Sequence, residues 1–415
     1  MSLAAPATRV PSERTVLLTL AAVQFTHILD YMIMMPLGAG LMKVFSISPE
    51  QFSHLVAAYG GSAAIAGLLG GFFLDRIDRK RALASLYVGF AFSTLCCALA
   101  PTHGALMAAR IAAGTCGGLA GALVIAMVAD VVPPERRGRG LAFVMSAFPL
   151  ASVAGVPLGI TLSNHLGWHA PFFLLAGLAV PILFAITRYL PHRAPSPGAA
   201  RAPALAQMRD LLAESIHWRG FAVTAALVSA NGFMIPFMAP SLVANAGVSD
   251  DHLWLVYLCG GLATFASTPF IGRLTDRHDK LHVLACVTVP AVTAALLVTH
   301  LGATPLPLIL LATSLFFVGM SGRFGPATTL VANAVEPRFR GGFMSLNSAV
   351  QQGASALANI VGGTLITTDA AGHLLGYGRV GWLATGAFGL TLVLAHRLRA
   401  AAPHAAVNRA PAPAA

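Results

Sequence analysis

The stretch GGFFLDRIDRKR, residues 70–81, decides the fold once the rest of the chain is compared with it. It closes a long apolar run with a block of charged residues, and a shortened copy, FIGRLTDRHDK, occupies residues 270–280. The aspartates of the two copies, Asp75 and Asp276, lie 201 residues apart. Self-similarity at a fixed spacing is the mark of repeated structural units, so these stretches predict two related halves.

A second pair of loops has the same spacing. DVVPPERRGRGLAFVMS at residues 130–146 matches NAVEPRFRGGFMSLNS at residues 333–348, with Glu135 and Glu336 again 201 residues apart. Two bundles related by duplication around a central pathway are the design of carriers that expose a midplane site alternately to each side of a membrane. A duplicated bundle without a transport role is the alternative.

Composition places this duplicated chain in a membrane. Of its 415 residues, 56% are hydrophobic and only 10% are charged. Soluble domains carry roughly 25% charged residues, and disordered chains are typically richer still in charge. The apolar runs are about 20 residues long, which fits membrane-spanning helices and not the ~10-residue alternating strands of barrels. The first run is also too long for a cleaved signal peptide.

We therefore predict an all-α integral membrane protein with twelve transmembrane helices in two pseudo-symmetric six-helix bundles. The expected spans are 16–42, 52–74, 82–100, 105–128, 141–163, 171–190, 221–244, 253–274, 281–300, 305–331, 343–367 and 376–396. The expected organisation is a cytoplasmic tail (1–15), an N-terminal bundle (16–190), a cytoplasmic linker (191–218), a C-terminal bundle (219–399) and a disordered cytoplasmic tail (400–415).

The net charge of +11 is a signal of topology. With the N-terminus in the cytoplasm, the opposite loops contain only Lys43 and Arg379, the spans contain Arg110 and Arg323, and all other Lys and Arg residues fall on the cytoplasmic side. The positive-inside rule requires this asymmetry, so we expect both termini in the cytoplasm and no nucleic-acid partner. The 23 Arg against 3 Lys, with abundant Ala and Gly, indicate a bacterial source and hence the inner membrane.

Several stretches resemble motifs of a known family. GGFFLDRIDRKR resembles the signature loop between helices two and three of the major facilitator superfamily. Residues 25–37 (FTHILDYMIMMPL) resemble the first-helix motif of its twelve-span drug:proton antiporters, and residues 109–118 (ARIAAGTCGG) resemble the fourth-helix motif. The resemblance, which extends to sugar-efflux-like permeases, implies a carrier that works as a monomer among membrane lipids.

A fifth-helix motif adds a direction of transport. ASVAGVPLG, residues 151–159, resembles the Gly-Pro element that marks exporters, in a looser form with Gly155, Pro157 and Gly159. These residues are expected to permit close packing and bending of the fifth span. The resemblance therefore favours export.

Only one carboxylate lies deep in an expected span. Asp30 stands about 21 Å into the first span, where a charged acid costs several kcal/mol unless it is paired or protonated. Such a group suits the uptake and release of a proton. The resemblance implies that Arg110 takes part in coupling, so we expect it to hold Asp30 charged in one conformation and to release it in the other. A structural polar lock between the two is the alternative.

His27 precedes Asp30 by three residues on the same helix face. A histidine there can relay protons, or it can simply be hydrogen-bonded, and both interpretations stay open. We assign Asp30, Arg110 and His27 to proton coupling.

Arg323, in SGRFGPA at residues 321–327, lies near the middle of the tenth span. Its side chain cannot easily reach water from there, and embedded arginines usually pair or bind a ligand. We expect it to anchor a substrate anion or to serve coupling in the second half, with a lock to helix carbonyls as the alternative. Neutral amides inside spans can orient a substrate or join helices. Those assigned to substrate binding are Gln24, Asn231 and Gln351.

The loop motif carries a mechanical expectation that the resemblance implies. Asp75 is expected to lie against the N-terminus of the eleventh span at Gly341, where the helix dipole would stabilise its carboxylate. Arg79 is expected to reach Asp130 and to help close the cytoplasmic side in the outward-facing state. A solvated cluster that only sets topology is the alternative. The residues assigned to this latch are Gly71, Asp75, Arg76, Arg79, Asp130 and Gly341.

Together these features predict a secondary active transporter that exports a small amphipathic compound or metabolite in exchange for protons. No Walker motif, GxSxG or HExxH sequence occurs, so we expect neither an enzyme nor a cofactor. His165 and His169 lie in loop context, and no metal site is expected. Proton-coupled uptake of an organic anion or sugar is one alternative. A sensor or scaffold without transport is another, and it predicts that the Asp30→Asn variant is silent.

Overall fold

The structure is a computed structural model that describes residues 12–73, 77–133, 136–192 and 204–402. Its first half contains α1 (Glu13–Ile33), α2 (Gly38–Phe45), α3 (Pro49–Phe73), α4 (Arg79–Ala98), α5 (His103–Val131), α6 (Arg137–Met145), α7 (Ala147–Leu150), the π-helical turn η2 (Ala151–Gly155), α8 (Val156–Leu166) and α9 (Ala170–Tyr189). Its second half contains α10 (Ala204–Ala213), α11 (Ser215–Ala244), the short 3₁₀ turn η3 (Asp250–His252), α12 (Leu253–Arg277), α13 (Lys280–Thr299), α14 (Leu306–Gly322), α15 (Phe324–Ala334), α16 (Arg340–Thr364) and α17 (Tyr377–Ala401).

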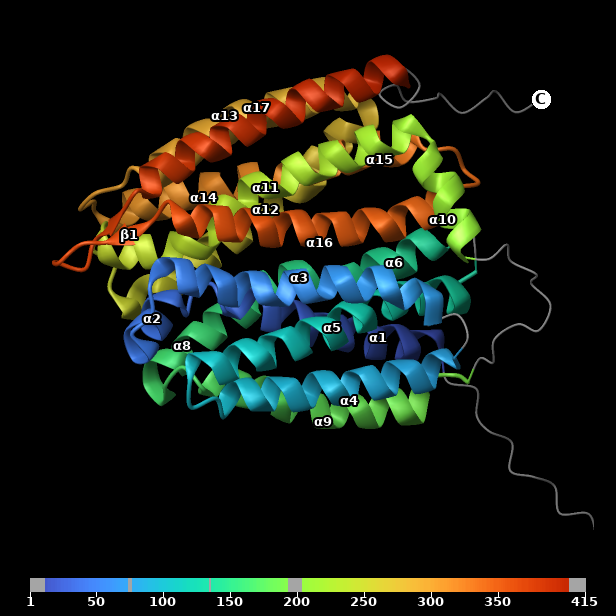
Figure 1. Ribbon diagram of the computed structural model, residues 1–415, viewed down its shortest axis with the longest axis horizontal. Coiled ribbons are helices and arrows are strands. Elements are labelled where there is room, and N and C mark those ends of the chain that lie inside the picture. Colours follow the sequence, from blue (N-terminus) through green and yellow to red (C-terminus); the bar gives the residue numbers. More distant parts are fainter. Residues whose placement is uncertain (1–11, 74–76, 134–135, 193–203, 403–415) are drawn as a thin grey trace, which may run out of the picture.

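The long helices lie alongside one another as one elongated bundle. In Figure 1 the helices of the first half fill the lower part of the view and those of the second half the upper part. A two-stranded antiparallel hairpin, β1 (Thr367–Thr368) and β2 (Leu374–Leu375), pairs Thr367 with Leu375. We call the end of the bundle with this hairpin and α2 the hairpin end, and the end where α1 begins and α17 ends the terminal end.

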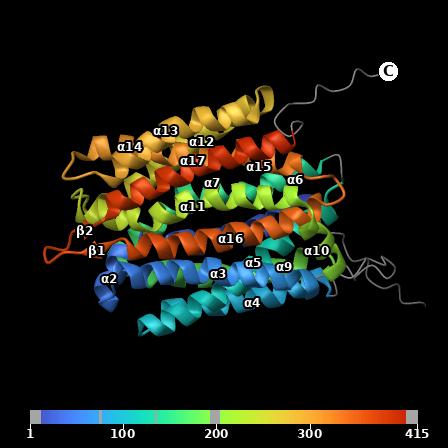
Figure 2. The same ribbon diagram turned by 45° about the horizontal axis from the view of Figure 1, so that its top comes forward.

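Eleven helices of the described ranges are long and apolar enough to cross a membrane. The twelfth expected span is α16, which is long enough at 25 residues but more polar than the others. It packs between α3 and α11, as Figure 2 also shows. Two of its polar residues, Asn347 and Asn359, are buried. A helix enclosed by other helices can carry amides that a lipid-facing helix cannot, so α16 completes the expected set.

The first expected span is shorter than predicted. It was expected to run to residue 42, but α1 ends at Ile33 and a separate helix, α2, begins at Gly38. Pro36 lies between them and has no N–H to continue the α-helical ladder. The seventh span, in contrast, begins at Ser215, inside the expected linker of residues 191–218, which also contains α10.

The duplication is visible in one pair of equivalent helices, α4 of the first half and α13 of the second. α4 and α13 begin and end at positions 201 residues apart. Each is capped by an aspartate at the same spacing, Asp78 and Asp279, whose carboxylates accept backbone N–H groups of the first turn. Each aspartate also meets a basic residue at the end of its half: Asp78 lies 3.4 Å from His192, just beyond α9, and Asp279 lies 2.9 Å from Arg399 in the last turn of α17.

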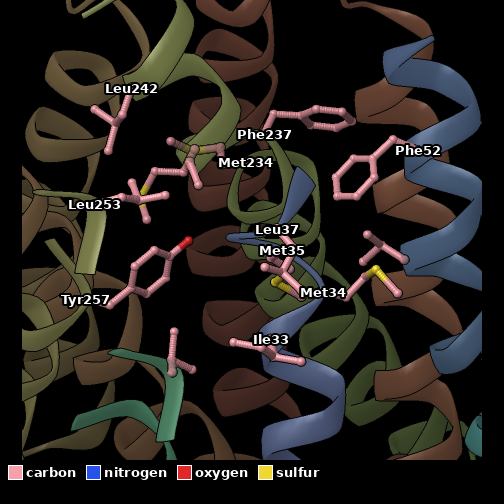
Figure 3. Packing of buried hydrophobic residues seen from close by; sticks show 14 of the residues in the cluster. Ile33, Met34, Met35, Leu37, Phe52, Met234, Phe237, Leu242, Leu253 and Tyr257 are labelled. Atoms are coloured by element: carbon pink, nitrogen blue, oxygen red, sulfur yellow. The ribbon is translucent and has the colours of Figure 1, made fainter. Parts of the chain in front are cut away.

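The apolar cores show how the halves are joined. At the hairpin end a single cluster includes residues of both halves, such as Met34 and Phe52 from the first and Met234 and Phe237 from the second. Figure 3 shows these side chains converging between the helices. At the terminal end each half has its own cluster, one around Tyr87 and one around Phe343. Among the described residues, the two halves therefore share a core at the hairpin end and have separate cores at the terminal end.

Glycines allow the close contact between the halves near the hairpin end. A Cβ built on Gly363 of α16 would clash with Ser53 of α3. Farther along the same helix pair, a Cβ on Gly353 would lie 3.6 Å from the Cβ of Ala64, an ordinary contact. The α3–α16 interface is therefore tightest at the hairpin end.

Candidate functional site

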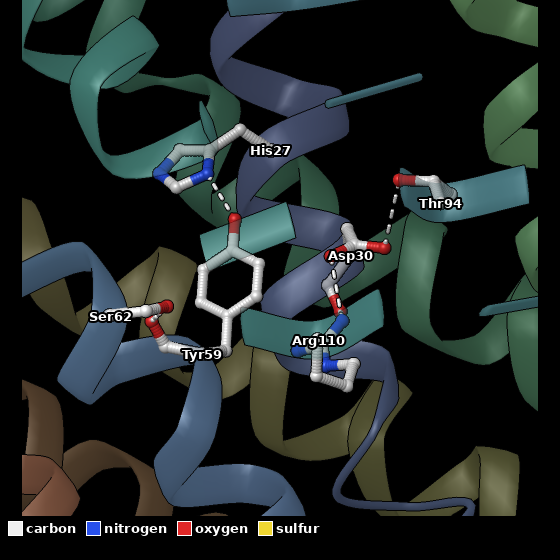
Figure 4. Close-up of polar contacts among 6 residues, drawn as sticks. All are labelled: His27, Asp30, Tyr59, Ser62, Thr94 and Arg110. Carbon is white, nitrogen blue, oxygen red and sulfur yellow. Dashed lines mark hydrogen bonds and ion pairs between the residues drawn. The ribbon is translucent and has the colours of Figure 1, made fainter. Parts of the chain in front are cut away.

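The centre of the candidate site is a buried ion pair between α1 and α5 (Figure 4). Arg110 Nη1 lies 2.7 Å from Asp30 Oδ2, and neither side chain is exposed. The same nitrogen donates to the main-chain oxygen of Asp30 at 3.2 Å. The sequence predicted that these two residues form a polar pair, and the structure brings them together.

Two side chains that the sequence analysis missed complete the surroundings of the pair. Thr94 Oγ1 donates to Asp30 Oδ1 at 3.5 Å. The guanidinium carbon of Arg110 lies 4.5 Å from the centre of the Tyr59 ring, a distance typical of a cation–π contact. A threonine and a tyrosine in apolar helices are ordinary residues, so the sequence carried no signal that could single them out.

His27 belongs to the same cluster through Tyr59. Its Nδ1 lies 2.5 Å from the Tyr59 hydroxyl, and the two rings stack with centroids 5.9 Å apart. Gly117 of α5 leaves room for the imidazole, since a Cβ there would lie 2.7 Å from His27 Nδ1. Tyr59 therefore connects His27, at its hydroxyl, to Arg110, at its ring face.

The fifth span packs against the segment of α1 that carries Asp30. It changes from α-helical to π-helical over η2, where the N–H of Val156 donates to the Ala151 carbonyl, just before Pro157, which cannot donate. A Cβ on Gly155 would lie 2.8 Å from Leu29, and a Cβ on Gly159 would clash with Ile33. The expected close packing of this motif is thus present, and it is directed at the residues on either side of Asp30.

Arg323 lies at the break between α14 and α15 and is fully buried. Its Nη2 donates to the carbonyl oxygen of Leu227 in α11 at 3.3 Å, and its guanidinium carbon lies 4.0 Å from the centre of the Phe388 ring. Among the described residues, Nε and Nη1 of Arg323 make no hydrogen bond. A contact with a helix carbonyl, the alternative to an anion anchor, is therefore present, and it leaves two of the three guanidinium nitrogens unpartnered within the described ranges.

The amides assigned to substrate binding are spread along three helices. Gln24 of α1 is buried, and Asn231 of α11 and Gln351 of α16 are partly buried. In the described part of the chain, Gln24 Oε1 and Asn231 Oδ1 have no hydrogen-bond donor. Unpaired buried oxygens are costly, so these two positions can accept hydrogen bonds from a ligand.

The latch residues are only partly described. Arg79 Nη1 lies 2.7 Å from Asp130 Oδ2, as the sequence analysis expected, with each side chain about one quarter exposed. Asp75 and Arg76 lie outside the described residues, and the surroundings of Gly71 are not described. Within the described ranges nothing lies within 4 Å of a Cβ built on Gly341.

Membrane-length helices in two halves related by an internal repeat are the architecture of many helical membrane carriers. The family model of the Major Facilitator Superfamily matches residues 20–358 and 221–414, and the chain belongs to this superfamily. The expected family resemblance and fold class are thereby confirmed. The chain is a transporter and not an enzyme, as the sequence predicted.

Several relatives match most of the chain. A chloramphenicol resistance protein of Streptomyces lividans is 28% identical over 72% of this chain and 74% of its own. The MFS-type transporter YceJ of Bacillus subtilis is 24% identical over 86% of this chain and 90% of its own. A "Probable sugar efflux transporter" of Helicobacter pylori strain J99 is 23% identical over 58% of this chain and 60% of its own.

Solved structures share the fold at low identity. The peptide transporter POT in complex with sulfate has a TM-score of 0.72 at 16% identity and covers 94% of this chain and 95% of its own. A bacterial homologue of the lysosomal transporter Spinster, in an inward-facing and occupied conformation, has a TM-score of 0.67 at 17% identity and covers 97% of both chains.

Proposed function

We propose that this transporter exports a small amphipathic compound in exchange for protons. The observation that carries the proposal is the buried Asp30–Arg110 pair. Two unit charges enclosed by protein are stable only while both are present, so protonation of Asp30 removes the partner of Arg110 and favours a different arrangement of the guanidinium. A group that alternates between these two states couples proton binding to a conformational change.

Tyr59 extends the proposal to His27. The Tyr59 hydroxyl bonds to His27 and the Tyr59 ring packs on Arg110. Movement of the Arg110 guanidinium therefore changes the position of the Tyr59 ring and, with it, the hydrogen bond to the His27 imidazole. We assign His27 the role of relaying the proton to and from Asp30. An imidazole that is only a hydrogen-bonded packing residue is the alternative, and substitution of Tyr59 separates the two.

Export is favoured by two features. The Gly155–Pro157–Gly159 element packs beside Asp30, and relatives of the chain carry names that refer to drug resistance and to sugar efflux. Proton-coupled uptake uses the same ion pair with the opposite sign of coupling, so a flux measurement distinguishes the two directions.

We further propose a bacterial inner-membrane protein that works as a monomer with both termini in the cytoplasm. Apart from Lys43 and Arg379, the described Lys and Arg residues outside the spans lie toward the terminal end, which the positive-inside rule assigns to the cytoplasm. With that orientation, the shared apolar core closes the outer side, and the separate cores belong to the cytoplasmic side. The Arg79–Asp130 pair then lies at the cytoplasmic end, in the latch that also includes Asp75 and Gly341.

Proton flux in reconstituted liposomes tests the proposal. Liposomes with an internal pH dye are loaded with chloramphenicol, a sugar, benzoate or ethidium, which sample neutral, anionic and cationic chemistry, and are then diluted. Antiport acidifies the lumen as the compound leaves, and symport makes it alkaline. We expect acidification with the wild type and with Asp30→Glu, which keeps an acid, and none with Asp30→Asn. Compound efflux at equal rates in wild type and Asp30→Asn, without proton movement in either, would make the protein a facilitator and Asp30 a structural lock.

A further inference from the structure

The second half of the protein buries an arginine that has no acid beside it. Among the ion pairs of the described residues, none includes Arg323, although its side chain is as inaccessible as that of Arg110. Both guanidinium groups stack on an aromatic ring, Tyr59 for Arg110 and Phe388 for Arg323. The difference between the two sites is the carboxylate.

The internal repeat identifies the position in the second half that corresponds to Asp30 and that carries no acid. The 201-residue spacing that relates α4 to α13 places Asn231 of α11 at the position of Asp30 in α1. Arg323 donates to the carbonyl of Leu227, which is the oxygen that accepts the N–H of Asn231 in an α-helix. The guanidinium of Arg323 therefore lies against α11 one turn from Asn231, as the guanidinium of Arg110 lies against α1 at Asp30.

The unpaired nitrogens of Arg323 suit an anion, whereas the unpaired oxygen of Asn231 suits a hydrogen-bond donor elsewhere on the ligand. Nε and Nη1 of Arg323 and Oδ1 of Asn231 make no hydrogen bond within the described ranges. A buried guanidinium with free N–H groups is unfavourable until an anion accepts them, and a planar carboxylate matches its donor geometry. The ring of Phe388 provides an apolar wall beside the charge.

We propose that Arg323 binds a carboxylate group of the transported compound, which takes the place that Asp30 occupies beside Arg110 in the other half. This assignment rests on the proposed transport function and gives its substrate class, an amphipathic compound with a single carboxylate. In this arrangement Asp30 binds the transported proton in the first half, and Arg323 binds the carboxylate of the substrate in the second half.

Asn231→Asp is the decisive variant, because it restores the missing acid from within the chain. The probes are three carboxylates, benzoate, 4-phenylbutyrate and decanoate, each compared with its neutral primary amide. Binding is followed by the thermal stability of the whole protein in lipid nanodiscs as the ligand is titrated. We expect at least one carboxylate to bind the wild type roughly tenfold more tightly than its amide, because hydrogen bonds between a guanidinium and a carboxylate are stronger than those to a neutral amide.

In Asn231→Asp this preference for the carboxylate is lost, because the introduced acid competes with the ligand for Arg323. If no carboxylate of the panel is preferred over its amide by the wild type, or if Asn231→Asp keeps the preference, the proposal is wrong. Arg323→Gln gives an independent test in case Asn231→Asp does not fold: it should bind the amides as the wild type does and show no preference for the carboxylates, and a preference that persists overturns the assignment.

The test separates this inference from the proposed function. Asp30→Asn should keep the carboxylate preference while it loses proton flux. Carboxylate binding without any compound-driven proton movement would support the Arg323 site and contradict proton-coupled export. Proton-coupled flux that depends on Asp30 but is unchanged in Arg323→Gln would support proton-coupled export and contradict the Arg323 site.

Discussion

A single nitrogen of Arg110 holds Asp30 at two points, with Nη1 2.7 Å from the carboxylate oxygen Oδ2 and 3.2 Å from the main-chain oxygen. The second contact does not depend on the charge of the side chain. The guanidinium therefore keeps a hold on α1 when the carboxylate is neutral. We expect protonation to loosen the pair without separating α5 from α1.

The ion pair makes a prediction about stability. Replacing one partner leaves the other as a buried uncompensated charge, which typically costs about 3–5 kcal/mol. Asp30→Leu and Arg110→Leu should each lower the free energy of unfolding by this amount, measured by chemical unfolding in mixed micelles. The double variant should be more stable than either single variant. A double variant that shows the sum of the two losses would contradict a direct pairing.

The Tyr59 hydroxyl separates a proton relay from simple packing. Tyr59→Phe keeps the ring beneath Arg110 and removes the hydrogen bond to His27, at a cost to stability of about 0.5–1.5 kcal/mol. If His27 relays protons, compound-driven proton flux should fall several-fold in Tyr59→Phe. It should fall no further when His27→Gln is added. Unchanged proton flux in Tyr59→Phe would leave His27 as a packing residue.

The glycine of the fifth span predicts a difference between two alanine variants. A Cβ at Gly155 would lie 2.8 Å from Leu29, whereas nothing described lies within 4 Å of a Cβ at Gly177 in α9. Gly155→Ala should destabilise the protein by about 1–3 kcal/mol through overpacking, and it should slow transport because Leu29 adjoins Asp30. Gly177→Ala, the matched control, should keep both properties. Equal behaviour of the two variants would refute a steric role for Gly155.

The Arg79–Asp130 pair can be tested by exchange of its charges. Each side chain is about one quarter exposed, so the pair contributes only about 0.2–1 kcal/mol to stability. Arg79→Asp and Asp130→Arg should therefore fold, yet each should lower transport several-fold if the pair belongs to a latch. The double variant should recover part of the activity. If it recovers none, the pair is a topology signal and not a mechanical contact.

The close approach of Gly363 to Ser53 predicts that this contact stabilises the packing of the two halves at the hairpin end. Gly363→Ala forces α16 away from α3, so amide hydrogen exchange should increase in α2 and at the end of α11. Gly353→Ala is the control, because its Cβ would meet the Cβ of Ala64 at an ordinary 3.6 Å. An exchange pattern unchanged by Gly363→Ala would show that this contact does not hold the halves together.

The features that sequence reasoning could reach were those with an unusual chemical cost. Asp30 and Arg110 were found because charged residues in apolar spans are rare and must be compensated. α16 was expected as a span because residues 343–367 form an apolar run between polar breaks. The latch contact of Arg79 with Asp130 followed from the family motif.

Other features depend on three-dimensional packing and left no mark in the sequence. Tyr59 and Thr94 became part of the site only when α3 and α4 were placed beside α1. The end of α1 at Ile33 was missed because the apolar pattern continues through Pro36. The equivalence of Asn231 and Asp30 was present in the 201-residue spacing, but it gained meaning only when Arg323 was seen to touch α11 at Leu227.

The shared apolar core at the hairpin end also acts as electrical insulation. A protein that carries protons on Asp30 must not let them run freely across the membrane, because such a leak would discharge the gradient that drives its own cycle. Met34, Phe52, Met234 and Phe237 belong to a cluster of apolar and aromatic side chains that contains no carboxylate, amine, guanidinium or imidazole. In the proposed orientation, this cluster keeps the transporter from leaking protons into the cell when no compound is being exported.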